Sequence, residues 1–173
     1  FGIISAYDKE EDVRSSWKKN AIGYRDRFER SAYRCDREGG ASFATATTSV
    51  GDLENLIRGE VSSFKSDETK PFQWSQLCER SLLMRRLKLA DERLTSGTAS
   101  AKSFSNSIDQ LVHAAEIVAC FGELLVQPEL VDWDDSDYKA HARKMKEYAL
   151  EVRAAVNEGD YEDARNAAKS ISQ

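Results

Sequence analysis

The chain has 173 residues, which is enough for one domain with an appendage and for a substantial buried core. Its net charge of -5 and the lack of clustered Lys and Arg argue against a protein that binds duplex nucleic acid. The apolar run from Ile117 to Phe121 is far shorter than the roughly 20 residues of a membrane-spanning helix, so we predict no membrane span. Only 2 Pro and 9 Gly accompany 32% charged residues, a composition typical of a soluble helical protein.

The first 70 residues predict a helical N-terminal extension. Apolar or small side chains recur every three or four residues over 8–38, which predicts a helix that a pair of glycines ends. Residues 41–48, rich in Thr and Ala, predict a loop, with a short edge strand as the alternative. A Ser-x-x-Asp start predicts a second, shorter helix over 49–64. The polar stretch 66–71 predicts a linker.

Denser apolar periodicity begins after this linker. Leucine and alanine side chains form a seam over 75–97, with Gly97 at the position of a helix C-cap. A polar connection of Ser, Thr and Ala follows over 95–103. The next amphipathic pattern predicts a long helix over 104–128, which Pro128 terminates.

The last part of the chain predicts two more helices. An acidic loop over 129–137 leads into a helix with Ser136 as its N-cap and Gly159 at its end. Asp160 is expected to cap a final helix that runs to Gln173.

Four successive helices over 75–173 predict an all-α protein, an up-down four-helix bundle, with residues 1–70 as a helical N-terminal extension.

Negative charge is concentrated in the C-terminal half. Residues 98–173 contain eight basic and fourteen acidic side chains, which indicate either a solvated acidic face or a docking surface for a basic partner. Trp133, between Asp132 and Asp134, is a candidate contact for such a partner. Trp17 lies on the apolar stripe of the first helix and is expected in a core.

Three cysteines, Cys35, Cys78 and Cys120, are too far apart in sequence for a Cys-x-x-Cys pair or a zinc-type spacing. We expect isolated, mostly buried thiols, with a disulfide plus one free thiol as the alternative.

Two histidines, His113 and His141, are available as bases or metal ligands. A di-iron carboxylate bundle needs Glu-x-x-His on two helices, but Gln110 and Tyr138 stand three residues before these histidines. His113 and Glu116 share a helix face, and we expect a hydrogen-bonded or solvated histidine there and no metal site. Because no Gly-x-Ser-x-Gly elbow is present either, we favour a non-enzymatic protein, with a metal-dependent enzyme of bundle type as the weakest alternative.

Three segments, LCERSLLMRRLKLADERL at 77–94, FSNSIDQLVHAAEIVACFGELLVQP at 104–128 and YKAHARKMKEYALEVRAAVNEGDYEDARNAAKSISQ at 138–173, resemble helices of the cytochrome c-prime family. The family consists of extracytoplasmic four-helix bundles that bind haem c. The resemblance implies a periplasmic location, a role in electron transfer or diatomic-gas binding, and a place for Met84 on the distal side of the haem. It also implies self-association as a homodimer.

The family's haem-attachment motif, Cys-x-x-Cys-His, does not occur within residues 1–173, where no c-type haem is attachable in the family's way. Because the sequence starts at Phe1 and stops where the motif is expected, one hypothesis is a processed or trimmed chain whose haem segment follows Gln173. The alternative hypothesis is a haem-free helical interaction module that holds a protein partner.

Overall fold

A computed structural model of the chain forms two compact units, Phe1–Phe72 and Gln73–Gln173. The structure describes residues 23–24, 40–58, 60, 73–74 and 80–172. These described residues form six helices and no strand, so the predicted all-α fold is confirmed. The helix predicted over 8–38, with Trp17, Cys35 and the linker 66–71, lies almost entirely outside the described residues, and so does Cys78.

Helix α3 (Gly40–Ile57) corrects the loop predicted over 41–48 and the helix start predicted at Ser49. Threonine disfavours helices through its branched Cβ, and its hydroxyl competes for backbone hydrogen bonds. Here the hydroxyls of Thr47, Thr48 and Ser49 each donate to the carbonyl four residues earlier, at 2.9–3.0 Å. These hydroxyl groups therefore bond within the helix and do not interrupt it.

Helix α4 (Arg80–Gly97) matches the predicted leucine seam, whereas the helix predicted over 104–128 is two helices. Helix α5 (Ala101–Asn106) is capped by the Ser100 side chain, and α6 (Ile108–Leu124) follows after Ser107, whose backbone is not helical. Pro128 lacks the N–H that would bond to the Leu124 carbonyl, and a proline ring clashes with the carbonyl four residues before it. Helix α6 ends at Leu124, earlier than predicted, and the Leu124 carbonyl accepts from the Gln127 N–H in a tighter turn before the proline.

Helices α7 (Ser136–Glu158) and α8 (Tyr161–Ile171) lie close to their predicted bounds. The N-cap of α7 is Asp135 and not Ser136, because the Asp135 carboxylate accepts a 2.7 Å hydrogen bond from the Tyr138 N–H. The predicted helix end at Gly159 and the predicted N-cap at Asp160 are confirmed. Gly159 has a φ of 76°, in the left-handed region, and the Asp160 side chain accepts from the Asp163 N–H.

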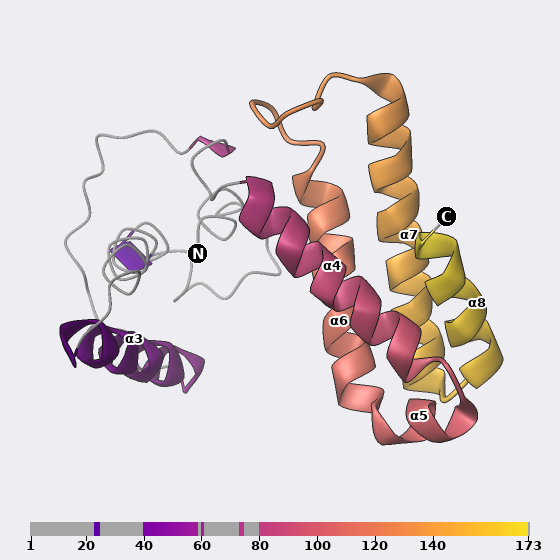
Figure 1. Ribbon diagram of the computed structural model, residues 1–173, viewed down its shortest axis with the longest axis horizontal. Coiled ribbons are helices and arrows are strands. Elements are labelled where there is room, and N and C mark those ends of the chain that lie inside the picture. Colours follow the sequence, from indigo (N-terminus) through magenta and orange to yellow (C-terminus); the bar gives the residue numbers. More distant parts are fainter. Residues whose placement is uncertain (1–22, 25–39, 59, 61–72, 75–79, 173) are drawn as a thin grey trace. The chain divides into compact units, whose positions relative to one another are not determined.

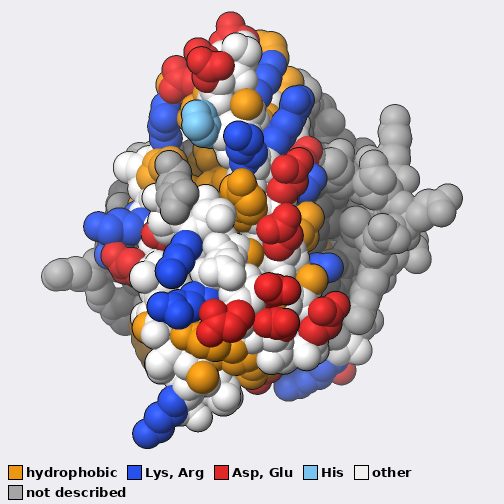
Figure 2. Space-filling model, turned by 90° about the vertical axis from the view of Figure 1, so that its right-hand side faces the viewer, with side chains coloured by type: hydrophobic (Ala, Val, Ile, Leu, Met, Phe, Trp, Pro, Cys, Tyr) orange, Lys and Arg blue, Asp and Glu red, His pale blue; other side chains and the backbone are white. Residues whose placement is uncertain are grey.

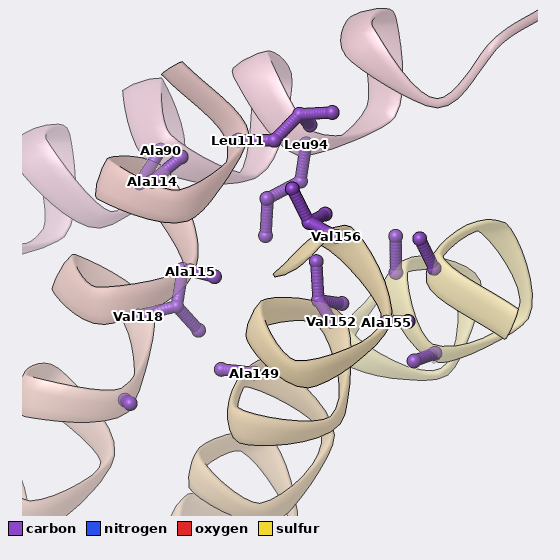
Figure 3. Packing of buried hydrophobic residues seen from close by; sticks show 14 of the residues in the cluster. Ala90, Leu94, Leu111, Ala114, Ala115, Val118, Ala149, Val152, Ala155 and Val156 are labelled. Carbon is purple, nitrogen blue, oxygen red and sulfur yellow. The ribbon is translucent and has the colours of Figure 1, made fainter. Parts of the chain in front are cut away.

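The helices of the C-terminal unit pack in a closed circuit, in which α4 contacts α6, α6 contacts α7, α7 contacts α8, and α8 contacts α4 (Figure 1). The strict up-down order stays a prediction. Side chains from all four helices and from α5 meet in one buried cluster, part of which Figure 3 shows. Nine of its fifteen members are alanines, whose small side chains let the helices approach closely.

Two glycines mark the tightest approaches. A Cβ on Gly122 of α6 would lie 2.7 Å from both the Ala142 carbonyl oxygen and the Lys146 Cβ of α7. A Cβ on Gly97 would lie 2.7 Å from Leu111 Cδ2. A larger residue at position 97 would therefore require the Leu111 side chain to move. Gly97, predicted at a C-cap position, is the last residue of α4.

Candidate functional site

One face of α4 carries exposed leucines and arginines in a single row. Leu82, Arg85, Leu89 and Arg93 follow one another at spacings of three and four, so they share a face of the helix. Leu82 is 53% exposed and Leu89 is 42% exposed, although their neighbours Leu83 and Ala90 are buried. We call these four residues the α4 stripe.

Helix α4 carries more basic than acidic side chains. Helix α4 contains five basic and two acidic side chains, against a net charge of -5 for the whole chain. Arg85 and Arg93 are exposed, and neither guanidinium group has an ion-pair or hydrogen-bond partner among the described residues. The stripe therefore offers two apolar and two cationic groups without an internal partner in the part that the structure describes.

The α4 stripe differs from the surface seen in Figure 2, where acidic side chains gather in groups beside basic and apolar ones. On α7 a single leucine, Leu150, is comparably exposed at 38%. The residues three and four positions away from Leu150 include no second leucine, and the two basic ones among them, Lys146 and Arg153, pair with Glu123 and Glu116 of α6. An isolated exposed leucine of this kind is ordinary on a protein surface.

The acidic loop over 129–137 is anchored to the bundle by ionic contacts. Arg80 of α4 donates to Asp132 at 3.3 Å, and the Lys139 ammonium lies 5.1 Å from the centre of the Trp133 ring. Trp133 is exposed, as a partner contact would require. Burial raises the pKa of Tyr138, the Arg80 guanidinium opposes this shift, and Asp132 adds to it.

Two of the candidate metal ligands, His113 and Glu116, contact arginine side chains. His113 is exposed, and its Nε2 lies 3.4 Å from the Arg86 guanidinium. The Glu116 carboxylate pairs with Arg153 of α7 at 3.8 Å. Across the described part of the chain, no three residues among His, Cys, Asp and Glu gather closely enough to hold a metal ion.

Cys120 corrects the expectation of buried thiols, because it is an exposed free cysteine on α6. Local desolvation raises the pKa of its thiol, and the nearby Glu123 carboxylate raises it further. Glu123 itself accepts a 2.8 Å ion-paired hydrogen bond from Lys146. A thiol with a raised pKa is a weak nucleophile at neutral pH, so Cys120 does not resemble a catalytic cysteine.

Met84, the candidate distal haem residue, is 40% exposed and does not belong to the buried cluster. The space between α4, α6 and α7 is filled by side chains such as Leu94, Val118 and Val152, all fully buried (Figure 3). Among the described residues, this arrangement does not fit a haem between the helices.

The α4 stripe was missed by the sequence reasoning, which recognised only the buried seam of Leu83, Leu87, Ala90 and Leu94. The available signal was a second pair of leucines seven residues apart, Leu82 and Leu89, which cannot lie on the same side of a helix as that seam.

Comparison of the chain with protein-family models, with curated proteins and with solved structures gives no match. None of the described helices is both long enough and apolar enough to cross a membrane.

Proposed function

We propose that the chain is a haem-free helical interaction module that binds a protein partner and catalyses no reaction. The observation that carries this proposal is the α4 stripe, in which exposed leucines alternate with arginines that have no ion-pair partner among the described residues. Apolar side chains seven residues apart on one helix face match the spacing at which helices bind partners, and arginine is enriched among the residues that dominate binding energy.

The packing of α4 against its neighbouring helices favours this role. The residues that follow Leu82, Leu89 and Arg93 in sequence point about 100° away and are buried against the rest of the bundle: Leu83, Ala90 and Leu94. Helix α4 contacts both α6 and α8. A helix held on its buried side presents its outer side chains in fixed positions, which lowers the entropy lost when a partner binds.

The cytochrome c-prime resemblance, with its haem, periplasmic location and homodimer, stays a prediction. It gains no support from Met84, whose side chain is exposed, nor from the filled interior of the bundle.

The test is a quantitative binding comparison with matched variants. Partners captured by the full chain from an extract of its source would be identified, purified and titrated calorimetrically against the wild type and against Leu82→Ser/Leu89→Ser. We expect the double variant to bind at least tenfold more weakly, because both apolar contacts of the stripe are removed.

Leu150→Ser on α7 is the control, since it removes a leucine of similar exposure from another helix. It should leave the affinity unchanged within about twofold, and both proteins should keep the wild-type melting temperature. Equal affinity of the wild type and the double variant for every purified partner would refute the proposal.

A further inference from the structure

The α4 stripe has the dimensions and the period of a helix-binding surface. The row runs over twelve residues of helix, Leu82 to Arg93, which is roughly 16 Å along the axis at a rise of 1.5 Å per residue. Its spacings of three and four place an apolar and a cationic group alternately along one line. A second helix laid alongside repeats its own side chains at this same period.

Charge complementarity defines the chemistry of that second helix. The guanidinium groups of Arg85 and Arg93 lack carboxylate partners among the described residues, and planar guanidinium groups bind carboxylates with two parallel hydrogen bonds. Leu89 lies between these two arginines and Leu82 lies before them, and both leucines require apolar side chains on the partner that faces them. We infer that the α4 stripe binds an amphipathic helix of a partner protein that presents Glu or Asp beside leucines. This inference rests on the proposed function, and it adds the chemical class of the partner.

An anionic membrane is the competing ligand for a basic surface with exposed leucines. Helices that lie on membranes separate a continuous apolar face from a basic one. In the α4 stripe Arg85 lies between Leu82 and Leu89 in the same row, so inserting the leucines into lipid would carry a guanidinium group with them. The net charge of -5 opposes attraction of the whole chain to an anionic surface. These observations favour a protein helix.

The experiment measures fluorescence anisotropy of a labelled synthetic peptide with the full chain. The acidic peptide has about 20 residues, enough to form a helix, with leucines and glutamates at alternate spacings of three and four. The control peptide replaces each glutamate with lysine. The wild type should bind the acidic peptide at least tenfold more tightly than the lysine peptide, with affinity that falls as salt is raised.

Two variants test the chemistry. Arg85→Glu/Arg93→Glu should reverse the preference in favour of the lysine peptide, whereas Leu82→Ser/Leu89→Ser should weaken binding of both. Leu150→Ser is the control that should bind as the wild type does. If the charge-reversed chain does not keep the wild-type circular dichroism and melting temperature, Arg85→Gln/Arg93→Gln replaces it, with loss of the preference as its expected result.

Equal binding of the two peptides by the wild type would overturn the inference. So would binding to vesicles of phosphatidylcholine and phosphatidylserine in the absence of acidic-peptide binding. The proposed function is judged separately: a purified partner that needs Leu82 and Leu89 but lacks an acidic helix would overturn the inference and leave the proposed function standing.

Discussion

At the scale of single residues, Gly122 sets the separation of α6 and α7. The nearest atoms to an added Cβ include backbone, the Ala142 carbonyl oxygen at 2.7 Å and the Lys146 nitrogen at 3.0 Å, which cannot move without shifting α7. Gly122→Ala should therefore lower the free energy of unfolding by about 1–2 kcal/mol, the cost of overpacking outweighing the roughly 1 kcal/mol gain in helix propensity. Urea denaturation followed by circular dichroism measures this change.

Gly51→Ala is the matched control, because a Cβ at this position of α3 meets nothing within 4 Å. It should not lower the urea midpoint of the bundle. A Gly122→Ala protein as stable as the wild type would show that α6 and α7 are not in close contact at this point.

A second prediction at this scale concerns the reactivity of Cys120. Its thiol has a pKa raised by desolvation and by the Glu123 carboxylate, so the thiolate fraction at neutral pH is smaller than in a free cysteine. Glu123→Gln removes the carboxylate charge that raises this pKa, and this change favours the thiolate. The pH at which alkylation by iodoacetamide reaches half its maximal rate should move down in this variant.

The alkylation is measured in a chain with Cys35→Ala and Cys78→Ala, so that one thiol is followed. Asp109→Asn, which removes a carboxylate from the first turn of the same helix, is the control and should leave the midpoint unchanged. A midpoint that does not move in Glu123→Gln would contradict the electrostatic account of this thiol.

At the scale of elements, the caps decide where helices begin. The Asp135 side chain accepts a hydrogen bond from the Tyr138 N–H at the start of α7, and no such contact is made by Ser136, the first helical residue. Asp135→Ala should cost about 1 kcal/mol of unfolding free energy, whereas Ser136→Ala should cost less than about 0.5 kcal/mol. Thermal or urea unfolding separates these values, and the reverse order would place the N-cap at Ser136.

Elements with a strong apolar period were predictable from the sequence, and weakly periodic ones were not. The ends of α7 and α8 carry local signals, a left-handed glycine at 159 and an aspartate cap at 160, that need no tertiary information. Helix α3 was missed because Thr and Ala give a weak pattern, and its threonine hydroxyls form hydrogen bonds that composition does not reveal. The break between α5 and α6 at Ser107 was also missed, because apolar side chains continue on both sides of it.

At the scale of the whole molecule, the C-terminal unit Gln73–Gln173 has its own core. The buried cluster draws its members from α4 to α8, and Phe104 of α5 packs edge-on against Tyr161 of α8 with ring centres 5.7 Å apart. We expect a chain of residues 73–173 to unfold in a single cooperative transition with a helical circular dichroism spectrum. A gradual, non-cooperative loss of helix in this fragment would contradict an independent core.

The candidate site was harder to predict from the sequence than the fold, because it depends on which face of α4 is buried. The family resemblance placed Met84 on the inner, haem-facing side of α4, whereas its side chain is exposed. The many leucines of α4 give the helix two possible apolar faces, and the sequence alone does not say which of them is buried. The structure buries Leu83, Ala90 and Leu94 and leaves Leu82 and Leu89 outside with the arginines. The acidic excess of the C-terminal half directed the sequence-based prediction to the loop over 129–137, whose role as a partner contact stays a prediction, and the basic character of α4 was not considered.

The most direct measurement of the central claim locates the bound partner on the chain. A photo-reactive amino acid would replace Glu92, which is exposed beside the α4 stripe, or, as the control, Leu150 on α7, and each protein would be irradiated with a purified partner. The account predicts cross-links to the partner from position 92 and none from position 150. Cross-links from position 150 without any from position 92 would place the partner elsewhere and contradict the role of the α4 stripe.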